Sequence, residues 1–216
     1  MVFFFTCSCK FNFKLTIVPE FIIYMGKDKF ENESLIAYGL PLDIWFHVDA
    51  LSSAHVYLRL PENSEYSLDN IPKDVLEECM QLVKHNSIEG CKLGSCKITY
   101  TPWENLNKTI DMEVGQVGFK DKKLVRYCNI DKNKDIVKRI SKTMVEKVVD
   151  LEKEKNEYEN RIKDIKKKLF KEQQIKNEEL KNINKVIISD KKFEYLQSNQ
   201  NLSKTNKQMN DDDDFM

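Results

Sequence analysis

Five side chains with chemically useful groups lie within one short stretch of the sequence, between residues 43 and 60. They are Trp45, His47, His55, Tyr57 and Arg59. The two runs that hold them, 44–48 and 54–60, are rich in β-branched and aromatic residues, which is typical of β-strands. Because side chains alternate along a strand, pairing the two runs places all five on one face. We therefore predict a face with aromatic rings, two imidazoles and a guanidinium, opposite a face of core residues.

Histidine titrates near neutral pH, so His47 and His55 are candidates for acid–base chemistry. The sequence shows no nucleophile motif, no paired carboxylates at helical spacing and no Gly-rich phosphate loop before a helix. Because a catalytic base needs a defined partner, we predict a binding protein and not an enzyme. Two alternatives remain for the histidines: a polar site that contacts phosphate or a base, or two partly buried, hydrogen-bonded side chains.

The cysteines offer a weak metal-binding pattern. Cys7-x-Cys9 and Cys91-x4-Cys96 could supply four thiolates, but neither pair has the two-residue spacing typical of a structural zinc site. The alternative to metal binding is a structural role, in which Cys79, Cys96 and Cys128 pack as small buried hydrophobic residues. We predict no bound metal, no cofactor and no disulfide.

The first 130 residues carry the pattern of an α+β domain with an antiparallel or mixed sheet. Besides the two central runs, strands are predicted at 2–6, 21–25, 96–101, 114–119 and 123–130, with a turn joining the last two. The one main packed helix is predicted from an apolar stripe at helical spacing, formed by Val75, Leu76, Cys79, Leu82 and Val83. A short helix is predicted from Asn32, as its N-cap, to Tyr38.

A long helical extension is predicted after this domain. Glycine and proline are absent after Gly118. Apolar residues recur at a spacing of three and four, at Val148, Leu151, Tyr158, Ile162, Ile165 and Leu169. The sequence therefore predicts a basic, helical coiled-coil segment over 132–188. The polar residues 189–216, which end in four aspartates before Phe215 and Met216, are predicted to be a disordered acidic tail.

The charges are balanced over the whole chain but unevenly distributed along it. Lysine and arginine total 35, as do aspartate and glutamate. Residues 1–119 hold 10 basic and 16 acidic residues, whereas residues 120–187 hold 21 and 13. The net charges of −6 and +8 indicate that an interaction element lies in the second half. The dense lysines of the helix are typical of a solvated helical face or of an arm that contacts phosphates.

Several motifs in the first half resemble those of the NFACT-R module. They are YMGKDKFENE from Tyr24, IWFHVDALSSAHVYLRL from Ile44, NSIEGCK from Asn86, YTPWENLNKT from Tyr100 and VGQVGF from Val114. This module is regarded as an RNA-binding domain, and it closes the ribosome quality-control factors that add C-terminal tails to stalled nascent chains. The stretch from Cys7 to Phe21 is longer and more apolar than the family's turn. The resemblance implies a non-enzymatic nucleic-acid-binding protein, with RNA in a translation setting as the partner. We expect this chain not to carry out tail synthesis, because its 216 residues leave no room for the further domains that the quality-control factors use for it.

The predicted site follows from the strand face, the family-like motifs and the basic helix. The candidate nucleic-acid-binding residues are Lys27, Lys29, Trp45, His47, Ser53, His55, Arg59, Lys108, Lys166, Lys167 and Lys168. Tryptophan and tyrosine rings on the strand face could stack on unpaired bases, although a core position is at least as typical for them. The acidic balance of residues 1–119 confines any phosphate-binding surface there to a local basic patch.

The partners expected from these features are RNA, with DNA as a further candidate, and either a coiled-coil protein or a second copy of the chain. A competing interpretation is a protein-interaction adaptor whose coiled coil is the working part, and a third is a DNA receptor at a membrane surface. No apolar run reaches the ~18–20 residues that a membrane span needs. We expect a cytoplasmic or nuclear location, with free thiols.

Overall fold

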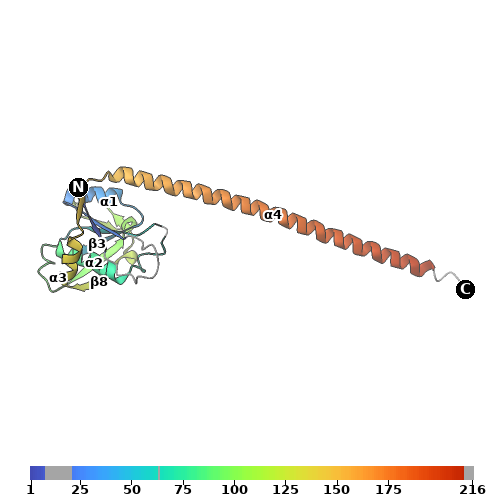
Figure 1. The fold of residues 1–216 in the computed structure, drawn as a ribbon, viewed down its shortest axis with the longest axis horizontal. Helices are drawn as coiled ribbons and strands as arrows, with labels where there is room; N and C mark the ends of the chain where they lie inside the picture. The colour runs from blue at the N-terminus through green and yellow to red at the C-terminus, as the bar shows by residue number, and fades with distance from the viewer. Residues whose placement is uncertain (8–20, 63, 212–216) are drawn as a thin grey trace. The chain divides into compact units, whose positions relative to one another are not determined.

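The computed structural model describes residues 1–7, 21–62 and 64–211 of the chain (Figure 1). The chain divides into two compact units, Met1–Tyr158 and Glu159–Met216. The first unit holds a seven-stranded sheet in which every pair of neighbouring strands is antiparallel, in the order β8-β5-β3-β4-β2-β1-β9. The strands are β1 (Val2–Thr6), β2 (Ile22–Gly26), β3 (Asp43–Val48), β4 (Val56–Arg59), β5 (Ser95–Pro102), β8 (Arg126–Asp131) and β9 (Val145–Lys147). The α+β prediction is confirmed.

The helices and a small second sheet complete the described elements. The helices are α1 (Lys29–Tyr38), α2 (Lys73–His85), α3 (Lys134–Ser141) and α4 (Leu151–Asp211), with 3-10 turns η1 (Trp103–Asn105) and η2 (Lys122–Leu124). The second sheet pairs β6 (Leu106–Asn107) with β7 (Gly118–Phe119). The strands predicted at 114–119 and 123–130 are therefore not neighbours, because β7 pairs with β6 and β8 pairs with β5.

The two faces of the large sheet carry separate cores. Phe46 and Leu58 lie on the face that α2 covers, where they pack with Val83 of that helix and Ile140 of α3. α3 lies beside α2 (Figure 1). Side chains of alternate residues point to the opposite face, where Trp45, Tyr24 and Tyr57 pack against Leu35 of α1. The predicted core face is thus confirmed, but the face that carries the candidate site is itself largely buried.

The first turn of α1 is capped by Asp28 and not by Asn32. The Oδ1 atom of Asp28 accepts hydrogen bonds of 2.9 Å from the backbone N–H groups of Phe30 and Glu31. Asn32 lies one turn into the helix and is buried, where its Oδ1 accepts a 2.9 Å hydrogen bond from the Tyr57 hydroxyl. Both residue types are good caps, and the carboxylate earlier in the chain takes the position.

The segment from 132 to 150 differs from the continuous helix that the sequence predicts. α3 buries Ile140 in the main core, and Arg139 Nη2 donates a 2.7 Å hydrogen bond to Glu78 Oε1 of α2. β9 then pairs antiparallel with β1 and forms one edge of the sheet. Both elements add to the domain after residue 130, where the sequence analysis placed its end. The helical extension itself begins at Leu151.

The beginning of α4 also belongs to the first unit. Leu151 packs against the core around Trp45, and Tyr158 is buried. These two residues were predicted as coiled-coil positions, but they contact the domain. Later in the helix Ile165 and Leu169 are 46% and 57% exposed. The long helix is therefore confirmed, and its supercoiling with a partner remains a prediction. α4 continues to Asp211, through most of the segment predicted to be disordered, and Asp212–Met216 lie outside the described residues.

A candidate nucleic-acid interface

The structure brings Trp45, His47 and His55 together at one end of the central strand pair. Trp45 Nε1 donates a 2.8 Å hydrogen bond to His55 Nδ1. The His47 ring stacks on the Trp45 ring, with centroids 5.5 Å apart and planes only 3° from parallel. The two imidazoles meet edge to face, with centroids 4.9 Å apart. The predicted grouping of these three rings on one strand face is present.

His55 is a structural residue within this group. Its side chain is buried, and burial lowers its pKa to about 3, with a further lowering from the neighbouring His47. A hydrogen bond with the backbone of Gly115 opposes the shift but does not cancel it. His55 is therefore neutral near pH 7, accepts at Nδ1 from the indole, and holds Trp45 against the loop that contains Gly115.

His47 is the more accessible of the two imidazoles. Its Nδ1 atom lies 2.7 Å from the carbonyl oxygen of Val48, and one side of its ring faces Trp45. Burial lowers its pKa, while hydrogen bonds with the backbone of Val48 and Ser53 act in the opposite direction. Two adjacent imidazoles with lowered pKa values are neutral at pH 7. They can accept or donate hydrogen bonds and stack, but they do not supply positive charge to phosphate.

Arg59 lies on the same face but at the opposite end of the strand pair. It is opposite Asp43 in the register, whereas Trp45 is opposite Tyr57. Its Nε and Nη2 atoms donate to the two carboxylate oxygens of Asp43, at 2.8 and 3.1 Å, and Nη1 donates to Glu154 of α4. Because Arg59 is used to join the sheet to α4, the structure does not bring it to the histidines.

Lys108 is also held by contacts within the protein. Its Nζ atom donates to Glu33 Oε1 at 2.9 Å and to the carbonyl oxygens of Glu113 and Gln116 at 2.7 and 3.0 Å. The same Glu33 oxygen accepts from the backbone N–H of Gly115 at 2.6 Å. Lys108 therefore fixes the loop of residues 108–116 against α1. Gly115 has φ of 86°, a conformation that glycine adopts without strain.

A polar pocket of about 390 Å³ lies between the histidines, this loop and the start of α1. Lys27 and Lys29 line it together with His47, Ser53 and Gly115. Lys27 makes a 3.1 Å ion pair with Glu146 of β9 but remains half exposed. Ser53 Oγ accepts from the backbone N–H of Val48 at 3.1 Å, which orders the loop between β3 and β4. We call this cavity the KH pocket, after Lys27, Lys29 and His47.

The charge of the KH pocket is mixed. Asp28 also lines it, and the pKa of this carboxyl is lowered by the backbone N–H groups of Glu31 and Phe30 that it caps. Lys29 Nζ lies 5.3 Å from the Phe30 ring centroid and makes no ion pair with any described residue. Asp28 lies between the two lysines, and Lys27 is also paired with Glu146, so the positive charge here suits contact with one or two phosphates and not a broad polyanion surface.

A neighbouring cavity of about 250 Å³ extends from the same residues. Trp45, His47, His55 and Gly115 line it, with Phe119 of β7 on its far side. Phe119 meets the Trp45 ring edge on, at a centroid distance of 5.7 Å. Trp45 is only 3% exposed, so its ring is core and is not a free stacking surface. The partly exposed rings that line this cavity are those of His47 and Phe119.

The sequence analysis did not place the loop of residues 113–116 at the site. The sequence VGQVGF, residues 114–119, overlaps this loop; it was recognised as a family motif but interpreted as a β-strand. The predicted residues of the basic helix lie in the second unit. Lys166, Lys167 and Lys168 are exposed on α4, where Lys167 approaches Asp164 at 3.9 Å.

The cysteines at the start of the chain were considered as candidate thiolate ligands. The Sγ atom of Cys7 donates a 2.6 Å hydrogen bond to Glu78 Oε2, and Cys9 lies outside the described residues.

Comparison with known proteins decides the family. The protein-family model described as the NFACT protein RNA binding domain matches residues 1–121. The chain belongs to the NFACT-R family. This match covers β1 through the loop at Gly115, and so includes every residue of the KH pocket.

Curated relatives match two thirds of the chain or more, and one matches its whole length. It is 44% identical over 217 residues to the Bos taurus protein named Coiled-coil domain-containing protein 25, with all of both chains covered. It is 52% identical over 164 residues to the Danio rerio protein of that name, covering 74% of this chain and 75% of the other. Identity to the Dictyostelium discoideum homologue is 55% over 145 residues, covering 67% and 69%.

Among solved structures, the C-terminal part of the fibronectin/fibrinogen-binding protein from Streptococcus suis is similar, with a TM-score of 0.46 and 16% identity. The matched region covers 61% of this chain and 52% of the Streptococcus suis chain. Separately, the helices in the described part of the chain include none with the length and apolar character that a membrane crossing requires.

Proposed function

We propose that this NFACT-R protein binds single-stranded RNA and that the KH pocket receives one unpaired nucleotide. The observation that carries the proposal is the cavity itself, which His47, Ser53 and the two lysines Lys27 and Lys29 line. A splayed base can enter such a cavity and stack on an imidazole, whereas a base within a duplex cannot. The two ammonium groups are then available to the flanking phosphates.

The protein acts without catalysis in this proposal. Both imidazoles have lowered pKa values, and His55 is held between Trp45 and Gly115. Among the described residues, neither imidazole makes a hydrogen bond to a carboxylate or to a nucleophilic side chain. A general base needs a partner within hydrogen-bonding distance. The site offers stacking, hydrogen bonding and charge, which together serve binding.

The setting we propose is translation or ribosome quality control, in the cytoplasm. The support is the family to which the chain belongs, whose matching domain is described as RNA binding. α4 adds a second binding element in this proposal. Its exposed lysines, among them Lys166, Lys167 and Lys168, contact further phosphates.

A protein partner for α4 is a second candidate function. Ile165, Leu169, Leu180 and Ile183 are each about half exposed. Apolar side chains that recur along a helix and stay this exposed are typical of a surface that a partner covers. A coiled-coil partner or a second copy of the chain would bury them. Polar substitution of Ile165 and Leu169 should then abolish partner recovery or self-association while RNA affinity is retained.

The test of the proposed function compares probes of equal length. Fluorescence anisotropy is measured with single-stranded RNA, single-stranded DNA and duplex RNA, for the full chain and for the His47→Ala variant. We expect single-stranded RNA to bind best, and we expect His47→Ala to weaken it by about 1–3 kcal/mol, the usual contribution of base stacking. A Lys97→Gln control changes a surface lysine that pairs with Asp49 and does not line the KH pocket.

Other outcomes would overturn parts of the proposal. Stronger binding to duplex RNA would exclude the pocket as a receptor for an unpaired base. Equal binding of single-stranded DNA would mean that the site does not use the 2′-hydroxyl, and would overturn the expected preference for RNA. If the His47→Ala variant kept its affinity for single-stranded RNA and an intact fold by circular dichroism, the imidazole would not be part of the binding site.

A further inference from the structure

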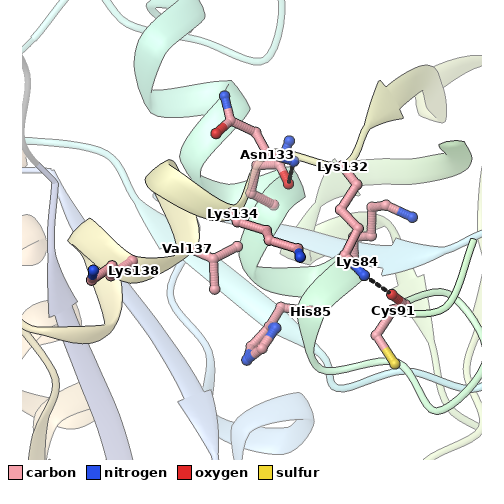
Figure 2. Close-up of a pocket in the computed structure, with 9 residues that line it drawn as sticks. Lys84, His85, Cys91, Lys132, Asn133, Lys134, Val137 and Lys138 are labelled. Carbon is pink, nitrogen blue, oxygen red and sulfur yellow. Dashed lines mark hydrogen bonds between the residues drawn. The ribbon is translucent and has the colours of Figure 1, made fainter. Parts of the chain in front are cut away.

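A second pocket, of about 500 Å³, lies among the helices that cover the other face of the sheet. Figure 2 shows its residues. Lys134, Val137 and Lys138 come from α3, His85 from the end of α2, and Cys91 from the loop that follows α2. The NFACT-R match ends at residue 121, so the α3 wall lies outside the family domain. We call this cavity the α2–α3 pocket.

Positive charge surrounds the α2–α3 pocket. Lys132, Lys134 and Lys138 are exposed at its edge. Lys132 Nζ donates a 2.6 Å hydrogen bond to the Cys91 carbonyl oxygen, whereas Lys134 and Lys138 make no ion pair with any described residue. None of the described residues that line the pocket carries a carboxylate. An occupant with negative charge is therefore favoured.

The polar groups deeper in the pocket are already bonded within the protein. Gln81 Nε2 donates to the Asp131 carbonyl oxygen at 2.6 Å, and Gln81 Oε1 accepts from the Asn133 N–H at 3.1 Å. Lys84 is buried, and its Nζ donates to the carbonyl oxygens of Gly90 and Leu93, both at 2.7 Å. Most of the remaining lining surface is apolar, including Val137. The buried part of an occupant must then be apolar as well, because a polar group there would lose its hydrogen bonds.

We propose that the α2–α3 pocket binds an acidic peptide segment of a protein partner through one apolar side chain, with carboxylates at Lys132, Lys134 and Lys138. Lys134 and Lys138 are one helical turn apart, so their Cβ atoms are separated by about 5–6 Å. Alternate side chains of an extended peptide repeat at roughly 6.6–7 Å, slightly more than this spacing, and the flexible lysine side chains can span the difference. An inserted base would leave its hydrogen-bonding edge unpaired among these apolar residues.

The chain itself contains a sequence with this chemistry and so supplies a probe. Residues 211–216 read Asp-Asp-Asp-Asp-Phe-Met, four carboxylates followed by two apolar side chains. Two matched peptides separate the two requirements. Asp-Asp-Asp-Asp-Ser-Ser retains the charge and lacks the apolar anchor, whereas Asn-Asn-Asn-Asn-Phe-Met retains the anchor and lacks the charge.

The experiment measures binding of the three fluorescein-labelled peptides to the full chain by anisotropy. The pocket variant is a double substitution, Lys134→Glu with Lys138→Glu. Its control is a second double substitution, Lys73→Glu with Lys123→Glu. The control makes the same charge change at exposed residues that do not line the pocket, one of them at the far end of α2. We expect only the peptide with both features to bind well. We expect a loss of about tenfold or more for the pocket variant and about twofold or less for the control.

A third variant tests the apolar contact without a change of charge. Val137→Ser should weaken the Asp-Asp-Asp-Asp-Phe-Met peptide about threefold or more and leave Asp-Asp-Asp-Asp-Ser-Ser unaffected. Equal losses in the pocket variant and in the control would refute the proposal, because binding would then follow net charge alone. It would also be refuted if oligouridylate, or vesicles of phosphatidylserine and phosphatidylcholine, bound the wild type in a Lys134- and Lys138-dependent way while the peptide did not. Melting curves of all variants establish that each one is folded.

Discussion

Removal of one buried carboxylate tests the conclusion that Arg59 is a structural residue. Asp43 is fully buried and accepts hydrogen bonds from the Tyr24 hydroxyl at 2.7 Å and the Leu40 N–H at 2.7 Å, besides two from Arg59. Asp43→Asn keeps the shape but replaces one acceptor oxygen with an amide that can only donate, and it removes the negative charge. The Arg59 guanidinium would retain its pair with Glu154 and lose its buried partner.

The expected cost is large because the lost charge is buried. Breaking a buried ion pair by removing one partner costs about 3–5 kcal/mol, whereas an exposed pair contributes about 0–1 kcal/mol. We therefore expect Asp43→Asn to lower the free energy of unfolding by about 3–5 kcal/mol. Asp49→Asn is the matched control, since Asp49 pairs with Lys97 at 3.0 Å and both side chains are substantially exposed. It should lower that free energy by about 1 kcal/mol at most.

The assay is urea denaturation followed by circular dichroism, with both variants and the wild type at one protein concentration. The midpoint should fall for Asp43→Asn with little change in the slope of unfolding free energy against urea, because a changed slope would signal a changed native or denatured state. A loss below about 1 kcal/mol, together with weaker RNA binding, would refute the reasoning. Arg59 would then belong to the nucleic-acid site and not to the junction with α4.

Two further predictions follow from the fold and the electrostatics. A fragment of residues 1–131 should fail to unfold cooperatively, because it lacks the buried Ile140 of α3 and the edge strand β9, whereas residues 1–158 should fold; urea titration of both fragments checks this. Burial lowers the pKa of His55 to about 3, so the unfolded chain binds more protons than the folded one between about pH 3 and 6.5, and stability falls as the pH drops through that window. In NMR titration the His55 imidazole should not protonate above about pH 5, and a midpoint near 6.5 would contradict the burial.

The strand pair and its two faces were predictable because their signals are local. Alternation alone places Trp45, His47 and His55 on one side of the sheet, and the core face opposite them is made of the remaining apolar residues of the same two runs. The partners of the cations were not predictable in this way. The contact between Arg59 and Asp43 depends on the register of β3 and β4. The contact between Lys108 and Glu33 depends on how the loop of residues 108–116 lies on α1.

The end of the first unit was missed for a related reason. Residues 132–150 are rich in lysine, and this composition resembles the solvated helix that follows. The two isoleucines of α3, Ile136 and Ile140, are one turn apart and both buried, but two apolar residues are too few to give a strong periodic signal. β9 is three exposed residues long, and it forms only because β1, far away in the sequence, offers a free edge.

The most direct test of the account is the salt dependence of single-stranded RNA affinity for the wild type and for Lys27→Gln with Lys29→Gln. Each lysine–phosphate contact to a single strand contributes about 0.7 to the slope of log affinity against log salt concentration. We predict that the double variant binds more weakly at low salt and that its slope is shallower by about 1.4. Superimposable curves for the two proteins, both folded by circular dichroism, would contradict the placement of RNA at the KH pocket.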